Sequence, residues 1–144
     1  MITVQKILFL KKVPLFAGMP PDELGHLAGI AEEVIYPQGE VIIKQGDHGE
    51  EMFLIVEGEI EIHRDSESLA VLKEQNYFGE MAILDGEPRS ATATSLADCL
   101  LLRIRQPDFH GLLERHFNVS LTIIQTLTHR LREMNQGPVG NEGD

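Results

Sequence analysis

Hydrophobic residues recur at helical spacing at both ends of this chain and at strand spacing between them. Near the start, the apolar run Ile7–Leu10 predicts a short helix, and a second helix is predicted over residues 21–32, where Pro20 and Pro21 precede two acidic residues. Prolines fit a first helical turn, and acids there face the positive end of the helix dipole. The pattern therefore predicts an N-terminal helical segment.

From Val34 to Arg105, short β-rich runs are separated by turns that contain glycine, proline or aspartate. The runs are Val41–Ile43, Met52–Val56, Ile60 alternating with Ile62, Leu69–Leu72 and Ala91–Arg105. Many short strands with regular glycine punctuation are typical of antiparallel barrels and jelly rolls. We therefore predict a mainly β fold, an antiparallel β-roll or jelly-roll barrel (double-stranded β-helix), with N-terminal and C-terminal helices flanking it.

Helical spacing returns after the predicted strands. Pro107 and Asp108 predict a helix start, and a last helix is predicted over residues 119–135, with Ser120 or Asn118 as its cap. Its apolar stripe has three- and four-residue spacing and consists of Ile124, Leu127, Leu131 and Met134. Such a stripe packs either on the β fold or against a second copy as a homodimer, and the pattern leaves both open. We treat residues 1–136 as one domain and 137–144 as a flexible tail.

Composition narrows the function classes. The chain has 144 residues with 12 Lys and Arg against 23 Asp and Glu, a net charge of -11, so we expect no nucleic-acid binding by this chain alone. Its one cysteine, Cys99, lies in an apolar run and predicts a buried thiol in a reducing compartment, so we expect a cytoplasmic protein. No signal peptide is recognisable, and no uncharged run reaches the roughly 18 residues of a membrane span.

The segment Phe78–Ala93 contains the residues best suited to bind a ligand. Gly79 precedes a predicted short helix, whose first amides are unpaired donors that an anion can approach closely across a glycine. Arg89 adds a forked cation, Ser90 a hydroxyl donor, and Ala91 little bulk. A charge about 4 Å from a phosphate contributes roughly 4 kcal/mol at an effective dielectric of 20, before desolvation, against about 0.3–1 kcal/mol for a helix end. We therefore expect Arg89 to anchor a phosphate.

Glu80 would repel a phosphate, so it needs a different group of the ligand. A carboxylate accepts a hydrogen bond from a sugar hydroxyl, a charge-assisted contact worth roughly 1.5–3 kcal/mol. A ribose cyclic phosphate is a ligand that needs an anion seat and a hydroxyl acceptor side by side. The pairing of Glu80 with Arg89 therefore favours a cyclic nucleotide.

The same segment closely resembles the phosphate-binding cassette of the cyclic nucleotide-binding domain family, which includes the bacterial catabolite activator, protein kinase A regulatory subunits and nucleotide-gated channels. Phe78-Gly79-Glu80 and Pro88-Arg89-Ser90-Ala91-Thr92 match the two halves of the cassette. The resemblance extends over about residues 7–135, through segments that match the early helix and barrel glycines of the family: Pro14-Leu15-Phe16, Tyr36-Pro37, Gly39-Glu40, Gln45-Gly46-Asp47 and Phe53–Gly58.

This resemblance implies a role for each cassette residue. Glu80 would hold the ribose 2′-hydroxyl, and Arg89 and Ser90 the cyclic phosphate. The residues that would shape the pocket are Gly79, Met81, Ala82 and Ala91. The last helix would cap the base, through Arg130 or Thr126. Members that favour cGMP often place threonine directly after the phosphate arginine, so Ser90 favours cAMP, with cGMP as the alternative.

Other functions are kept as alternatives. The main one is a nucleotide-free interaction or dimerisation domain with a vestigial cassette, in which Arg89 and Glu80 pair with each other. We expect no enzyme, since no nucleophile motif is present, and no metal site or cofactor, since the 6 histidines are scattered. Too few residues follow the last predicted helix for a helix-turn-helix, so we expect that the chain belongs to a larger effector protein or acts on a separate partner.

Overall fold

The computed structural model describes residues 1–136, so the predicted tail 137–144 lies outside the described residues. Two helices, α1 (Thr3–Leu10) and α2 (Pro21–Ile30), precede the strands, and α4 (Gln106–Arg115) and α5 (Phe117–Asn135) follow them. A short helix, α3 (Glu80–Asp85), lies between the sixth and seventh strands. The strands are β1 (Ala31–Tyr36), β2 (Val41–Ile43), β3 (Glu51–Glu57), β4 (Ile60–Arg64), β5 (Glu67–Leu72), β6 (Tyr77–Phe78), β7 (Thr92–Ser95) and β8 (Cys99–Arg105).

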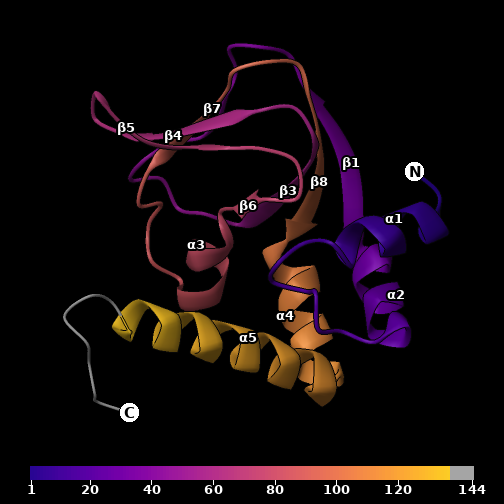
Figure 1. The fold of residues 1–144 in the computed structure, drawn as a ribbon. Helices are drawn as coiled ribbons and strands as arrows, with labels where there is room; N and C mark the ends of the chain where they lie inside the picture. Colours follow the sequence, from indigo (N-terminus) through magenta and orange to yellow (C-terminus); the bar gives the residue numbers. More distant parts are fainter. Residues whose placement is uncertain (137–144) are drawn as a thin grey trace.

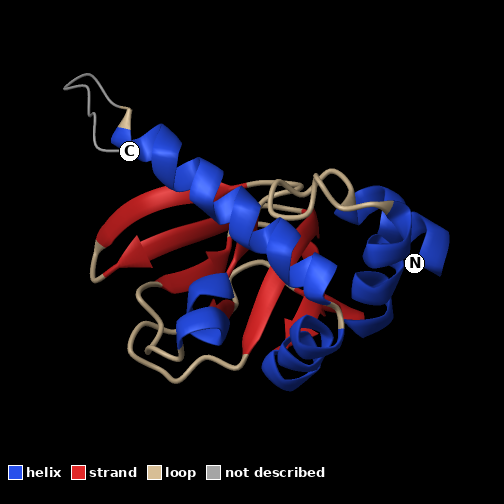
Figure 2. Ribbon diagram, turned by 90° about the horizontal axis from the view of Figure 1, so that it is seen from below, coloured by secondary structure: helices blue, strands red, loops and turns tan. Residues whose placement is uncertain are grey.

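The strands form two antiparallel four-stranded sheets, in the orders β1-β8-β3-β6 and β2-β7-β4-β5. Helices lie at one end and along one side of this β unit (Figure 1), and from below α5 crosses the strands with α3 beside it (Figure 2). This confirms the predicted mainly β, jelly-roll-like fold with flanking helices, here as two layers rather than one continuous barrel wall.

The sheet that contains β3 and β8 is buried on both faces. On β3, Met52 and Leu54 belong to one hydrophobic cluster, while Phe53 and Ile55 belong to another. Residues alternate between the two faces of a strand, so a strand covered on both sides is apolar throughout. The run Met52–Val56 therefore has no polar alternation.

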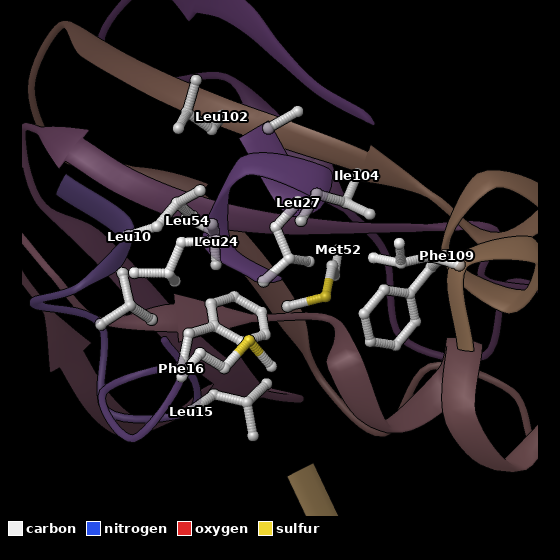
Figure 3. Close-up of a cluster of buried hydrophobic side chains, with 14 of the residues drawn as sticks. Leu10, Leu15, Phe16, Leu24, Leu27, Met52, Leu54, Leu102, Ile104 and Phe109 are labelled. Carbon is white, nitrogen blue, oxygen red and sulfur yellow. The ribbon is translucent and has the colours of Figure 1, made fainter. Parts of the chain in front are cut away.

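One cluster lies between the two sheets and the other joins the sheet to the helices. Between the sheets, the rings of Phe53 and Phe78 stack with their centroids 5.3 Å apart. On the other face, fully buried side chains from α1, α2 and α4 pack against β3 and β8 (Figure 3). Val119 of α5 belongs to the same cluster. The same cluster contains Ile83 of α3, so the short helix is packed into the body of the protein.

The boundaries and the buried face of the last helix differ from the prediction. Helix α5 begins at Phe117 after His116, and neither Ser120 nor Asn118 caps it. The Ser120 hydroxyl instead donates to the Leu113 carbonyl at 2.8 Å, which ties α5 to α4. Helix α2 also ends earlier than predicted, at Ile30, because β1 starts at Ala31.

Of the four residues in the predicted stripe of α5, only Leu127 packs against the body of the protein. Val119 and Ile123 are buried, and Leu127 packs partly against the same cluster. The other three residues of the stripe, Ile124, Leu131 and Met134, are exposed. The buried face is therefore displaced from the predicted stripe, because 119, 123 and 127 form a second apolar row at four-residue spacing. Every helix found within residues 1–136 is too short or too polar to span a lipid bilayer.

Candidate functional site

A cavity of about 300 Å³ opens beside α3. One side is formed by α3 and the loop that follows it, and the other by side chains of β2, β4 and β5. This volume is at the lower end of the range of small-molecule sites. All seven residues predicted to contact or shape the site line it: Gly79, Glu80, Met81, Ala82, Arg89, Ser90 and Ala91.

Arg89 lies in the wall of this cavity and is 7% exposed. Its guanidinium donates to the carbonyl of Gly79 at 3.0 Å and to that of Glu51 at 2.6 Å. Its backbone is also fixed, since its amide donates to the Asp47 carbonyl at 2.8 Å and its carbonyl accepts from Gly46 at 2.9 Å. An arginine has five N–H donors, so three remain after these two side-chain bonds.

Two glycines leave the space that this guanidinium occupies. A Cβ on Gly49 would lie 2.5 Å from Arg89 Nε, and one on Gly79 would lie 2.8 Å from an Arg89 terminal nitrogen. Gly79 also has a φ of 86°, a left-handed conformation that costs a side-chain-bearing residue energy. Gly79 therefore both turns the chain into α3 and admits the arginine.

Glu80 begins α3 and faces the same cavity. Burial raises the pKa of its carboxyl, and its own backbone amide and the charges of Arg130 and Arg89 offset this only in part. Burial likewise lowers the pKa of the Arg89 guanidinium, against the charges of Glu51, Asp47 and Glu80, but an arginine stays protonated at neutral pH. Among residues 1–136, no ion pair within 4 Å joins Glu80 to Arg89.

The cavity thus presents a fixed cation and a carboxylate that are not paired with each other to one small volume. Residues 33–116 match the family described as the cyclic nucleotide-binding domain. This chain belongs to that family.

Several known proteins resemble this cyclic nucleotide-binding domain. It is 34% identical to the cyclic AMP receptor protein of Thermus thermophilus over 86% of this chain and 60% of that protein. It is 34% identical to the cAMP-dependent protein kinase regulatory subunit of Emericella nidulans, over 73% of this chain and 26% of that one. The N-terminal domain of a transcriptional regulator from Streptomyces coelicolor superposes with a TM-score of 0.81 at 28% identity, covering 89% of this chain and 93% of that one. The chain thus spans about 60% or less of the two whole relatives.

The residues predicted to cap the base lie on α5 of the cyclic nucleotide-binding domain and do not line the cavity. Arg130 nevertheless donates a hydrogen bond to the hydroxyl of Tyr77, and its guanidinium carbon lies 5.7 Å from the centre of that ring. Tyr77 does line the cavity. Thr126 is half-buried on the same helix.

Sequence reasoning missed the apolar wall opposite the cassette, which consists of Ile43, Ile62 and Leu72, and it missed Tyr77. Ile62 lay in a recognised alternating run, but the pattern gives the face of a strand only relative to its neighbours. In residues 1–136, no group of three or more His, Cys, Asp or Glu side chains is placed to hold a metal ion.

Proposed function

We propose that this domain senses a cyclic nucleotide, preferring cAMP to cGMP, and that its C-terminal helix transmits binding to an effector. The observation that carries the proposal is the convergence of Arg89 and Glu80 on one cavity of about 300 Å³ without an ion pair between them. A side chain that is already held in place binds its ligand without the entropic cost of ordering it. Arg89, held by two carbonyls, meets that condition.

The cyclic phosphate would lie against Arg89 and Ser90. The guanidinium keeps three donors, and the Ser90 side chain is exposed beside it. Arginine matches phosphate oxygens in a bidentate geometry and contributes more than a neutral donor. Ser90 supplies a further hydroxyl to the same group.

The ribose 2′-hydroxyl would donate to Glu80. Burial removes solvation from the charged form of this carboxyl and so raises its pKa. A hydroxyl donor of the ligand would supply a hydrogen bond to the charged form. The base would then lie against the apolar wall of Ile43, Ile62 and Leu72.

The preference for cAMP is supported by two observations. Ser90, rather than threonine, follows the phosphate arginine. The names of the similar receptor protein and of the kinase regulatory subunit both specify cyclic AMP. We propose that the ligand is bound and released unchanged, so cAMP incubated with the protein should be recovered intact.

Calorimetric titration with cAMP and cGMP tests this function. We expect saturable 1:1 binding, tighter for cAMP, with Arg89→Ala weakening it by about 100-fold or more and Ser90→Ala by about fivefold. Arg89→Lys keeps the charge but not the fork, and should fall between wild type and alanine. Arg115→Ala, which removes a guanidinium outside the cavity, is the matched control. Equal affinity in wild type and Arg89→Ala, or no heat with either nucleotide, would contradict the proposal.

Transmission would use α5, because Arg130 of this helix contacts Tyr77 in the cavity wall. A base that enters beside Tyr77 would change that contact and with it the position of α5. Arg130 or, on the same helix, Thr126 would cap the base. Arg130→Ala should therefore weaken cAMP binding by roughly tenfold, measured by the same titration.

We also propose that a second copy of the chain covers the exposed face of α5. The face is 37–78% exposed and consists of Phe117, Leu121, Ile124, Leu131 and Met134. Apolar residues at this spacing form helix-pairing seams. Sedimentation velocity should show a dimer that Ile124→Glu with Leu131→Glu dissociates, while Gln125→Glu leaves it unchanged. A monomer in wild type at all accessible concentrations would exclude this interface.

Residues 1–136 would act as one sensing unit, since a single cluster joins all the helices to the sheet. The buried Cys99, whose thiol has its pKa raised by burial, suits a reducing cytoplasm. The effector, attached or separate, would be the protein that reads the position of α5.

A further inference from the structure

At the C-terminal end of α3, a single backbone oxygen accepts hydrogen bonds from two side chains of α4. The Ile83 carbonyl accepts hydrogen bonds from His110 Nε2 at 2.5 Å and from Gln106 Nε2 at 3.4 Å. Gln106 and His110 are four residues apart on α4 and therefore share one face of that helix. Two side chains of one helix thus converge on one acceptor of another.

This carbonyl has no backbone donor within α3, because the helical hydrogen bonds end before it. The amide that would continue the ladder onto Ile83 belongs to Glu87, and it donates to Asp85 Oδ1 at 2.8 Å instead. Gly86 closes the helix by donating to the Ala82 carbonyl at 3.0 Å. Helix ends leave carbonyls that need partners from elsewhere, and here α4 supplies them.

The side chain of Ile83 is buried in the same hydrophobic cluster as residues of α4 and α5. Ile83 is fully buried in a cluster with Phe109 and Leu112 of α4 and with Val119 and Ile123 of α5. The hydrophobic effect is non-directional, whereas hydrogen bonds to one atom depend on distance and angle. The polar contact therefore fixes where along α4 the end of α3 lies.

We infer that Gln106 and His110 are positioning residues that make α4 follow α3, and we call this pair with the Ile83 carbonyl the polar clamp. The path continues to α5, since only His116 separates α4 from α5 and Ser120 donates to the Leu113 carbonyl. Neither Gln106 nor His110 lines the cavity, so the clamp acts on coupling and not on ligand contact. The coupling role rests on the proposed function, but the attachment of α3 to α4 does not.

Hydrogen exchange measured by mass spectrometry tests the clamp without ligand first. In the combined variant Gln106→Ala with His110→Ala, we expect amides of α3 and Gly86 to exchange roughly tenfold faster, because their support is lost. His110→Gln, which keeps a donor, should restore most of the protection. Glu114→Ala, an exposed change one turn further along α4, is the matched control. Unchanged exchange in α3 would overturn the clamp.

The second arm adds saturating cAMP. In wild type we expect slower exchange in the cavity peptides and an altered rate in α5. In the combined variant the cavity response should remain, with affinity within about threefold of wild type by calorimetry, while the α5 response falls below half. An α5 response equal to that of wild type would overturn the coupling role. If wild type binds neither nucleotide, the proposed function fails, and the first arm still decides the clamp.

Discussion

Glu80 and Arg89 face the same cavity but are solvated in different ways. Arg89 is almost completely buried, yet its charge is met by the carbonyls of Gly79 and Glu51. Glu80 is half-buried, and burial raises the pKa of its carboxyl. The cation is thus satisfied without ligand, while the carboxylate is the group that gains most from one.

Glu80 should make the empty protein less stable at neutral pH. A carboxyl whose folded pKa lies above its ordinary value of 4.5 binds more protons in the folded state than in the unfolded state. The free energy of unfolding therefore falls as the pH rises from the ordinary pKa through the raised folded pKa. We expect Glu80→Gln to raise the melting temperature at pH 7, with the difference vanishing below about pH 4, where both side chains are neutral.

Thermal unfolding of both proteins between pH 3 and pH 8, without nucleotide, measures this difference. The same variant should bind cAMP at least about tenfold more weakly. A difference in melting temperature that is constant across this pH range would show that the charge of Glu80 is not the cause.

Gly49 should tolerate no side chain, because a Cβ there would lie 2.5 Å from Arg89 Nε and 2.8 Å from the Ala82 Cβ. We expect Gly49→Ala to displace the guanidinium, to destabilise the fold by roughly 1–3 kcal/mol and to weaken cAMP binding. Gly25→Ala in α2, where nothing lies within 4 Å, should instead stabilise by about 0.5–1 kcal/mol. Urea unfolding and calorimetry of the two variants check the contrast.

The sequence was sufficient to predict which side chains line the cassette side of the site, because they follow one another in one segment with recognisable chemistry. It was not sufficient for Tyr77 or for the wall of Ile43, Ile62 and Leu72, which comes from separate strands. It also could not show that Arg89 is held by backbone carbonyls, since every residue carries one. Contacts of that kind are set by the tertiary fold.

Among the elements, α5 shows why a periodic pattern does not fix a packing face. Its apolar residues form two rows, one with Val119 and Ile123, the other with Ile124 and Leu131. Both rows satisfy helical spacing, and the packing of the rest of the helical cluster decides which row is buried. By contrast, β3 was recognised because a fully apolar run of this length suits a strand covered on both faces. The predicted run Ala91–Arg105 instead divides into two strands, β7 and β8.

The two rows of α5 should therefore respond differently to truncation. Ile123 is 3% exposed, so Ile123→Ala should cost about 2–4 kcal/mol. Ile124 is 58% exposed, and Ile124→Ala should change the free energy of unfolding by less than about 0.5 kcal/mol at concentrations where the protein is monomeric. Chemical denaturation of both variants measures these changes. Similar losses in the free energy of unfolding would mean that α5 buries a different face.

In the whole molecule, the helical cluster and the intersheet cluster meet along β3 and β8. The cavity lies at one side of this body, with α3 between it and α4. The overall class of fold followed from the spacing of hydrophobic residues and turns. Its assembly into two sheets depends on long-range pairings, such as β1 with β8, that local patterns do not specify.

Ligand binding should stabilise the molecule as a whole. A ligand that binds only the folded state at 100 times its Kd adds about 2.7 kcal/mol, which corresponds to a rise on the order of 8 °C in Tm for a domain of this size. Differential scanning fluorimetry with cAMP should show this rise for wild type and little of it for Arg89→Ala. AMP, in which the phosphate does not form a ring with the ribose, serves as the matched ligand control.

The two carbonyl contacts of Arg89 bear on how such domains diverge. Because its guanidinium joins Gly79 to Glu51, a descendant that no longer met a nucleotide would still be selected to keep this arginine for folding. Glu80, which destabilises the nucleotide-free protein, could be replaced by other residues as soon as its ligand was lost. In surveys of genomes, an intact glutamate at this position is therefore better evidence of a working sensor than an intact arginine.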